Sequence, residues 1–165
     1  MIRGDYKQLI WTFKGVGKSC LLARWYCDGW PWYINPTDGV TYETRTVNYD
    51  NDNVEKHTWD ISGRTHPQSL APNYTSTIAI AWIVYDVTDQ RSFDNVRAWH
   101  GSVCQDSLIV IALVGNKIDL IGRVITTQQG ERLAAELGVK LFETSAKTNQ
   151  GKLFHFIPLY QIRNE

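Results

Sequence analysis

The sequence has no excess of either charge. Its 17 Lys and Arg residues balance 17 Asp and Glu residues over a length of 165. A protein that binds nucleic acid through the phosphates normally shows a basic surplus, so the composition argues against nucleic acid as a main partner. Cysteine is also scarce: Cys20, Cys27 and Cys104 follow neither a disulfide pattern nor a zinc-site spacing. A reducing, cytosolic compartment is the simplest interpretation.

Long apolar runs are also absent. The longest, Ile78–Tyr85 and Leu108–Val114, have eight and seven residues, whereas a membrane-spanning helix needs about 20. The N-terminal residues do not have the pattern of a signal peptide. Short continuous apolar runs are typical of strands buried on both faces of a sheet. With 43% hydrophobic and 21% charged residues, the chain is expected to form one globular domain over residues 1–165.

Tryptophan is unusually frequent. Seven occur in the chain, and four of them, Trp11, Trp25, Trp30 and Trp32, lie in one early stretch. Either these rings pack in the interior, or some of them form an exposed recognition surface, because tryptophan is enriched at binding hot spots. The sequence leaves both interpretations open.

Strand and helix patterns alternate along the chain. Strands are expected at residues 7–11, 41–48, 54–59, 78–86, 109–116 and 140–144, and helices at 18–26, 92–103, 127–137 and 152–163. The Asx-rich stretch Tyr49–Asn53 predicts a hairpin turn between two antiparallel strands. This alternation implies a three-layer α/β fold, with a mostly parallel sheet of six strands and helices on both faces. Ligands of such sheets bind beyond the carboxyl ends of the strands.

A phosphate-binding loop follows the first strand. Gly15, Gly17, Lys18 and Ser19 keep the last part of the pattern G-x-x-x-x-G-K-[ST], although Thr12 stands where the first glycine is usual. The two glycines let backbone N–H groups curl around a phosphate at the N-terminus of the next helix. Lys18 supplies a charge to the terminal phosphates, and the hydroxyl of Ser19 is a ligand for magnesium.

Two further loops carry a carboxylate just after a strand. Asp60 is expected to hold magnesium through water, and the N–H of Gly63 is expected to bond a terminal phosphate. Asn116, Lys117 and Asp119 follow the fifth strand. The Asp119 carboxylate suits guanine, which offers a ring N–H and an exocyclic amine. Adenine lacks this pair of donors, and its binding would leave the carboxylate unpaired.

The loop after the sixth strand completes the pattern. Ser145, Ala146 and Lys147 offer backbone N–H groups to the guanine carbonyl, and the stem of Lys147 offers an apolar surface to the base. Each loop alone also fits an ordinary turn. Together, however, the four loops carry phosphate, magnesium and guanine chemistry on successive strand ends. The sequence therefore predicts a guanine-nucleotide pocket.

The chain resembles the small GTPases of the Ras superfamily over nearly its whole length, and the Rab branch, which governs vesicle traffic, most of all. Its motifs at residues 15–22, 84–89, 113–117 and 142–147 carry this resemblance, and residues 123–147 are similar to the secretory, exocytic Rabs. The resemblance implies a P-loop NTPase G domain. It also implies a molecular switch that binds GTP or GDP with Mg²⁺ and hydrolyses GTP.

The resemblance further implies roles for individual residues. Residues 28–42 correspond to switch I and residues 60–74 to switch II. The implied catalytic residues are Lys18, Thr37, Gly63 and Arg64, and the implied magnesium ligands are Ser19, Thr37 and Asp60. The implied nucleotide contacts are Lys14, Gly15, Val16, Gly17, Lys18, Ser19, Cys20, Trp30, Thr37, Gly63, Asn116, Lys117, Asp119, Ser145, Ala146 and Lys147.

The sequence departs from the family where the chemistry takes place. Arg64 replaces the switch II glutamine that orients the attacking water, and a guanidinium cannot accept a hydrogen bond from water. Phe13 and Lys14 stand where Rabs usually have Asp and Ser. Lys14 adds a second cation beside the terminal phosphate. These changes predict slow intrinsic hydrolysis and a long-lived GTP state.

Effectors, exchange factors and GTPase-activating proteins are expected to bind through Thr37–Tyr42 and Gly63–Tyr74. Tyr42, Trp59 and Tyr74 match the aromatic triad of the Rab effector surface. Asp38, in contrast, replaces an apolar contact with effectors. The sequence ends at Glu165 without a C-terminal cysteine for prenylation. The expected location is cytoplasmic, and peripheral on the cytosolic face of a membrane where a lipidated tail is present.

Two other functions remain open from the sequence. The substitutions Thr12, Phe13, Lys14 and Arg64 also fit a pseudo-GTPase, a scaffold or interaction module that has lost nucleotide binding or hydrolysis. An ATP-dependent phosphoryl-transfer enzyme is the second alternative, because a phosphate loop does not choose the base. Asp119 argues against it, since it selects guanine.

Overall fold

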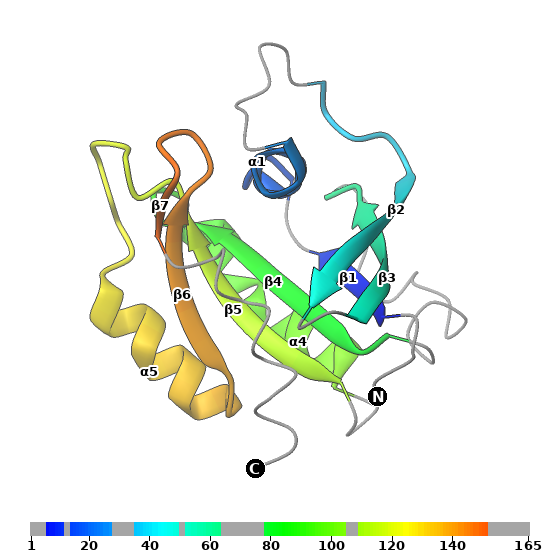
Figure 1. Cartoon of the computed structure of the whole chain (residues 1–165). Coiled ribbons are helices and arrows are strands. Elements are labelled where there is room, and N and C mark those ends of the chain that lie inside the picture. The colour runs from blue at the N-terminus through cyan, green and yellow to red at the C-terminus, as the bar shows by residue number, and fades with distance from the viewer. Residues whose placement is uncertain are drawn as a thin grey trace.

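The computed structural model describes residues 6–11, 14–27, 35–49, 52–63, 78–104 and 109–151. Strands and helices alternate along these residues (Figure 1). In chain order they are β1 (Tyr6–Trp11), α1 (Lys18–Cys27), β2 (Val40–Tyr49), β3 (Asp52–Ile61), β4 (Ile80–Asp86), α3 (Gln90–Asp94), α4 (Val96–Val103), β5 (Val110–Asn116), α5 (Thr127–Leu137), β6 (Lys140–Ser145) and β7 (Gln150–Gly151). The helix expected at residues 152–163 lies outside the described residues.

The strands form one mostly parallel sheet in the order β2-β3-β1-β4-β5-β6-β7. The pair β2–β3 is antiparallel, as the predicted hairpin requires, and Tyr49 lies opposite Asp52 at its end. The two-residue strand β7, which also pairs antiparallel, was not predicted and extends the expected six strands. From β1 the chain proceeds first toward one edge of the sheet and then toward the other. This reversal leaves a crevice at the carboxyl ends of the central strands.

Helices cover both faces of the sheet, as predicted (Figure 1). Strand β4 shows why, since its side chains alternate between two buried clusters. Ile83 and Tyr85 pack with α3, α4 and α5, whereas Trp82 and Val84 pack with α1. Residues on successive positions of a strand point to opposite faces, so a strand between two helical layers is apolar throughout. The continuous apolar run in the sequence reflects this double burial.

The helix expected at residues 92–103 is divided into α3 and α4. The carboxylate of Asp89 caps the start of α3 by accepting from the Arg91 N–H at 3.0 Å. Asn95 separates the two helices, and its side-chain amide donates to the Arg91 carbonyl at 2.7 Å. Such side-chain bonds compete with the helical ladder. The sequence prediction therefore placed the α4 end correctly and missed the interruption.

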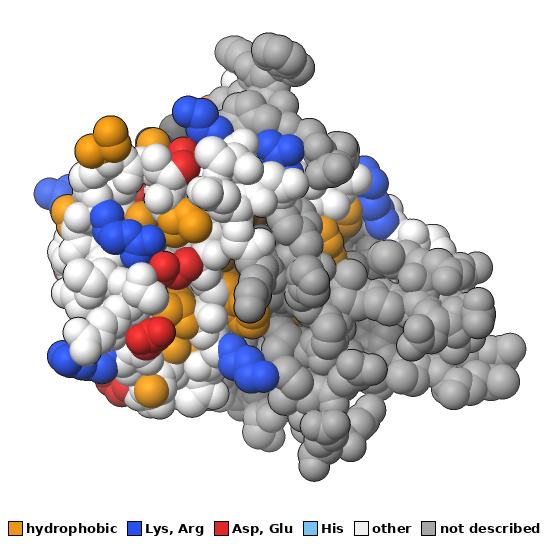
Figure 2. All heavy atoms as spheres, turned by 60° about the vertical axis from the view of Figure 1, so that its left-hand side comes forward, with side chains coloured by type: hydrophobic (Ala, Val, Ile, Leu, Met, Phe, Trp, Pro, Cys, Tyr) orange, Lys and Arg blue, Asp and Glu red, His pale blue; other side chains and the backbone are white. Residues whose placement is uncertain are grey.

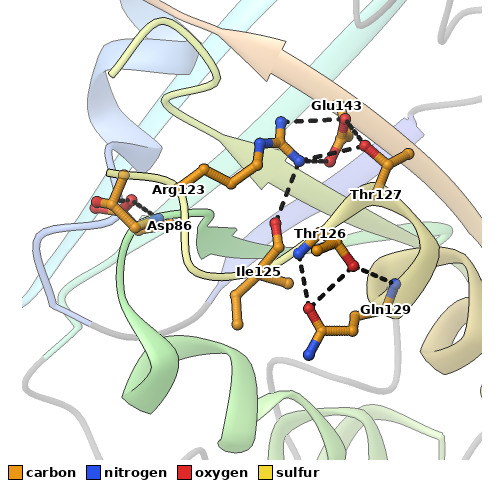
Figure 3. Close-up of polar contacts among 8 residues, drawn as sticks. Asp86, Arg123, Ile125, Thr126, Thr127, Gln129 and Glu143 are labelled. Carbon is orange, nitrogen blue, oxygen red and sulfur yellow. Dashed lines mark hydrogen bonds and ion pairs between the residues drawn. The ribbon is translucent and has the colours of Figure 1, made fainter. Parts of the chain in front are cut away.

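Helix α5 has the predicted bounds because both of its ends carry strong signals. Thr126 and Gln129 form a reciprocal capping box at its start (Figure 3). Gly138 ends the helix in the left-handed conformation, with φ +67°. Just before the cap, the two outer nitrogens of Arg123 contact both carboxylate oxygens of Glu143 on β6, at 2.6 and 3.2 Å (Figure 3). This ion pair fastens the loop after β5 to the neighbouring strand.

The phenol of Tyr85 fills a narrow space between two backbones. A Cβ atom at Gly115 would lie 2.8 Å from the Tyr85 hydroxyl oxygen, and one at Gly130 would lie 2.6 Å from it. The hydroxyl is buried and has no hydrogen-bond partner among the described residues. Its burial raises the pKa of Tyr85. The Tyr85 ring can therefore approach the backbones of β5 and α5 this closely only because positions 115 and 130 are glycine.

The face that carries α5 shows basic and acidic side chains intermixed (Figure 2). One example is the exposed ion pair between Arg97 of α4 and Glu136 of α5, with an N–O distance of 2.6 Å. Among the described residues of this face, neither sign of charge predominates (Figure 2). Among the described helices, none combines the length and apolar character needed to cross a membrane.

Candidate nucleotide site

A cavity of about 400 Å³ lies where the loops after β1, β3, β5 and β6 meet. This volume falls within the range of small-molecule sites. The lining residues are Lys14, Gly15, Gly17, Lys18, Ser19, Cys20, Asn35, Pro36, Thr37, Ser62, Gly63, Asn116, Lys117, Asp119, Leu120, Ala146 and Lys147. The structure thus brings together residues from all four loops that the sequence singled out.

Three predicted site residues lie behind the cavity wall and support it. Val16 and Ser145 are buried and bond to Asn116 and Asp119, respectively. Asp60 is also buried and contacts two hydroxyl groups of the lining. Other lining residues were missed by the sequence prediction: Asn35, Pro36, Ser62 and Leu120. Several residues singled out from the sequence lie outside the described part of the chain: Thr12, Phe13, Trp30, Trp32, Arg64 and Tyr74.

The phosphate loop turns on two glycines with positive φ. Gly15 has φ +81° and Gly17 has φ +94°, a region that strains other residues. The loop leads directly into α1, whose first N–H groups have no carbonyl acceptors within the helix. Lys18 begins the helix and is almost fully buried. Burial lowers the pKa of Lys18 to about 8, and the nearby Asp60 carboxylate partly opposes this. A bound phosphate would favour the charged ammonium further.

Three oxygen groups meet at the end of the cavity next to Lys18. The Ser19 hydroxyl lies 2.6 Å from the Thr37 hydroxyl and donates to Oδ2 of Asp60. The Thr37 hydroxyl donates to the same Oδ2 at 3.1 Å. The other oxygen, Asp60 Oδ1, is buried without a hydrogen-bond partner among the described residues. Two hydroxyls and a carboxylate with one unsatisfied oxygen are the hard oxygen donors that Mg²⁺ prefers, so these residues fit the ion.

Thr37 reaches this cluster because its segment is attached to β3. The Ser62 N–H donates to the Gly39 carbonyl at 2.8 Å, next to the first β2–β3 pair, Val40 with Ile61. The segment around Thr37 and the end of β3 are therefore held together by main-chain bonds. This attachment keeps the Thr37 hydroxyl within hydrogen-bond distance of the Asp60 carboxylate.

The opposite end of the cavity carries Asp119. The Ser145 hydroxyl donates to Asp119 Oδ1 at 2.6 Å and in turn accepts from the Thr148 N–H at 3.0 Å. These bonds fix the orientation of a carboxylate that lies at the cavity wall. Two donors in one plane, such as the N1–H and the exocyclic amine of guanine, match its two oxygens.

Lys117 forms the neighbouring wall and adopts an unusual backbone conformation, with φ +67°. Its ammonium contacts Oδ2 of Asp86 at 2.6 Å. Oδ1 of the same carboxylate accepts from the N–H and the hydroxyl of Thr88 at 2.8 and 2.7 Å. Asp86 is the last residue of β4 and was not predicted, although its position at a strand end is the signal used elsewhere.

A phosphate loop, a hydroxyl–carboxylate cluster and an anchored aspartate at the carboxyl edge of a doubly covered sheet define a P-loop nucleotide-binding domain of the α/β class. Comparison with known proteins agrees with this class. The family model described as the Ras family matches residues 7–161.

Curated relatives extend the match. The chain is 40% identical over 157 residues to the Ras-related protein RABE1e of Arabidopsis thaliana, covering 90% of this chain and 72% of that protein. It is 39% identical over 150 residues to the GTP-binding protein ypt2 of Schizosaccharomyces pombe, covering 88% and 75%. It is 35% identical over 154 residues to the Ras-related protein SEC4 of Saccharomyces cerevisiae, covering 92% and 72%.

The chain therefore belongs to the Ras family, and within it to the Rab branch, as a relative of the secretory Rabs. It is a small GTPase, a GTP-binding molecular switch of vesicle traffic. The fold and family predicted from the sequence are confirmed. Nothing in the comparisons favours the pseudo-GTPase alternative.

Proposed function

We propose that this chain switches by closing Thr37 on a magnesium ion held by Ser19 and Asp60 beside the terminal phosphate of GTP. The contact among these three side chains carries the proposal, because it joins the start of α1, the segment before β2 and the end of β3 at one point. Bound magnesium would neutralise phosphate charge. Departure of the terminal phosphate removes one reason for the two loops to stay closed.

The other end of the cavity selects the base in this proposal. Asp119 accepts from both donors of guanine, and Lys117 and Lys147 cover the faces of the ring. Lys14 and Lys18 bring two positive charges to the phosphates, one exposed and one buried. The main-chain N–H groups from Gly15 onward surround the phosphates at the N-terminus of α1.

The identity of the bound nucleotide tests this proposal. Purified protein is extracted with acid, and the released nucleotide is identified by mass. We expect GDP or GTP, retained in Mg²⁺ and released faster in EDTA. A protein that emerges empty, and remains empty after incubation with Mg²⁺ and GTP, refutes the proposal. ATP competing as well as GTP refutes the assigned role of Asp119.

We further propose that GTP hydrolysis is slow, because Arg64 stands where the family has a water-orienting glutamine. Single-turnover hydrolysis compares the wild-type protein with Arg64→Gln and, as a matched control, Arg64→Met. The glutamine variant is expected to hydrolyse GTP at least about tenfold faster, a barrier reduction of about 1.4 kcal/mol. The methionine variant stays slow. Equal rates in all three proteins contradict the role assigned to position 64.

For partner binding we propose the surfaces formed by Thr37–Tyr42 and Gly63–Tyr74. In the described part of these ranges, the Tyr42 side chain is half exposed, and its ring centroid lies 5.0 Å from that of Trp59. Its hydroxyl also bonds His57 Nδ1. This anchored aromatic patch supports effector binding, since rigid aromatic side chains lose little entropy on association. The neighbouring exposed Asp38 adds a negative charge that favours a basic partner.

We propose a cytoplasmic location on the ground that Rab relatives are soluble or peripheral on membranes. We also propose that the chain forms one G domain, which the family match over residues 7–161 supports. Both proposals follow from membership in the family.

A further inference from the structure

Arg24 lies in the last turn of α1 and reaches the loop after β6. Its Nε donates to the Ala146 carbonyl at 2.9 Å, and one of its outer nitrogens donates to the Lys147 carbonyl at 3.0 Å. These carbonyls belong to successive residues of the cavity wall. The rigid fork of a guanidinium is suited to bonding two acceptors at once.

The contact with Lys147 continues toward the base-selecting carboxylate. The Lys147 carbonyl and the Thr148 N–H belong to the same peptide group. That N–H donates to the Ser145 hydroxyl at 3.0 Å, and the hydroxyl donates to Asp119 Oδ1 at 2.6 Å. Hydrogen bonds linked in series polarise one another, so a charged donor at the start strengthens the later bonds.

We propose that Arg24 is a positioning residue for guanine recognition, and that it acts on Asp119 through the peptide after Lys147 and the Ser145 hydroxyl. This inference rests on the proposed function of the site. With the chain of bonds intact, the carboxylate keeps the rotation that presents both oxygens to the two donors of guanine. Without Arg24, the carboxylate retains its charge and loses its preferred rotation.

The same arrangement couples the two ends of the cavity. Helix α1 begins with Lys18 and Ser19 at the phosphate end, and Arg24 in its last turn supports the base end. A rigid helix thus joins phosphate binding to base selection. The sequence offers no signal for this role, because a basic residue in the last turn is ordinary for any helix.

The test uses two variants of Arg24 and one matched control. Arg24→Met removes all donors and keeps the aliphatic stem, whereas Arg24→Lys keeps the charge and is unable to bridge both carbonyls with a planar fork. The control is Arg45→Met. Arg45 also donates to a main-chain carbonyl at the end of α1, that of Tyr26 at 2.7 Å, and has no part in the bonds to Asp119.

Affinities for GDP and inosine diphosphate are measured by displacement of a fluorescent GDP analogue from the Mg²⁺-loaded protein. Inosine lacks the exocyclic amine, so the ratio of the two dissociation constants reports one of the two bonds to Asp119. In the wild-type protein we expect this ratio to be about tenfold or more. In Arg24→Met we expect GDP to bind about tenfold more weakly and the ratio to fall at least about threefold. Arg24→Lys should lie between the two, and Arg45→Met should keep the wild-type ratio.

A third comparison tests whether Arg24 acts through the Ser145 hydroxyl. In a Ser145→Ala background this series of hydrogen bonds is already broken, so adding Arg24→Met should change the ratio of the two dissociation constants little. Equal weakening of GDP and inosine diphosphate in Arg24→Met overturns the inference, as does an unchanged ratio in both Arg24 variants. Arg24→Lys decides the matter where thermal melting shows that Arg24→Met is unfolded. Wild-type protein that binds neither nucleotide refutes the proposed function itself, and the inference with it.

Discussion

The side-chain amide of Asn116 donates to the main-chain carbonyl of Val16 at 2.8 Å, inside the wall of the nucleotide cavity. Its oxygen accepts from the Ala146 N–H at 3.2 Å, and the side chain is almost fully buried. One residue therefore holds the loop after β1 and the loop after β6 at a fixed separation. Gly17 packs against the same amide, since a Cβ there would lie 2.5 Å from Asn116 Nδ2.

Gly17→Ala is expected to abolish tight nucleotide binding. The position has φ +94°, which strains an alanine, and the added methyl group displaces Asn116. We expect a loss of about 2 kcal/mol or more in the free energy of unfolding. Denaturant unfolding and GDP affinity measure the two effects. The control is Gly101→Ala in α4, where an added Cβ meets no atom of the described residues within 4 Å. This control should bind GDP normally, and a similar defect in it would argue against the local explanation.

Ser19→Ala is expected to weaken GTP binding only when magnesium is present. The variant loses a hydroxyl that contacts both Thr37 and Asp60, and it keeps the phosphate loop and the base end. We expect the dissociation constant for GTP in Mg²⁺ to rise about tenfold or more, which corresponds to about 1.4 kcal/mol. In EDTA, the variant and the wild-type protein should have the same dissociation constant for GTP. An equal loss in both buffers would mean that the hydroxyl serves the fold and not the ion.

Arg123→Met is expected to destabilise the fold without changing base selection. Arg123 pairs with Glu143, and the two side chains are 30% and 19% exposed, less than those of the Arg97–Glu136 pair. Removing the guanidinium leaves a carboxylate with Thr127 as its remaining partner in this cluster (Figure 3). We expect a loss of about 1–2 kcal/mol in thermal or urea unfolding. Arg97→Met, from a pair that is 54% exposed on both sides, should cost less than about 1 kcal/mol. Equal losses in both variants would contradict this ranking.

Stability is expected to fall in mild acid, partly because of His100. Partial burial on α4 lowers the pKa of His100, so the unfolded chain takes up the proton before the folded protein does. The contribution of neutral His100 to the free energy of unfolding is therefore fully present above the unfolded pKa of about 6.5. It is lost as the pH falls below that value. Urea unfolding from pH 8 to pH 5 should show a smaller decline for His100→Gln than for the wild-type protein. Parallel declines would show that other groups dominate.

Local signals were sufficient to predict most elements of the sheet and its helices. The run that became β4 is apolar throughout because both faces are covered, and the α5 bounds follow from Thr126 and Gly138. Strand β7 was missed because two residues carry no periodicity and pair only when β6 is already in place. The break at Asn95 depends on one side-chain bond within an otherwise helical pattern.

The residues that line the cavity were also predicted only in part. Lys18, Ser19 and Asp119 were predicted because they belong to short motifs that follow strands. Asn35 and Ser62 were not, since they line the site only by virtue of the segments that bring them there. The support given by Arg24 is a contact between residues 122 positions apart in the sequence, and a single sequence contains no record of such a contact.

The phenol of Tyr85 has a consequence for how this protein can change over time. Gly115, which it touches, immediately precedes Asn116, so a larger residue there would disturb the wall of the cavity from behind. A lineage that replaced Gly115 or Gly130 would need a shorter side chain at position 85 in the same step. The three positions are expected to drift together, and an isolated substitution at either glycine is a natural source of heat-sensitive alleles.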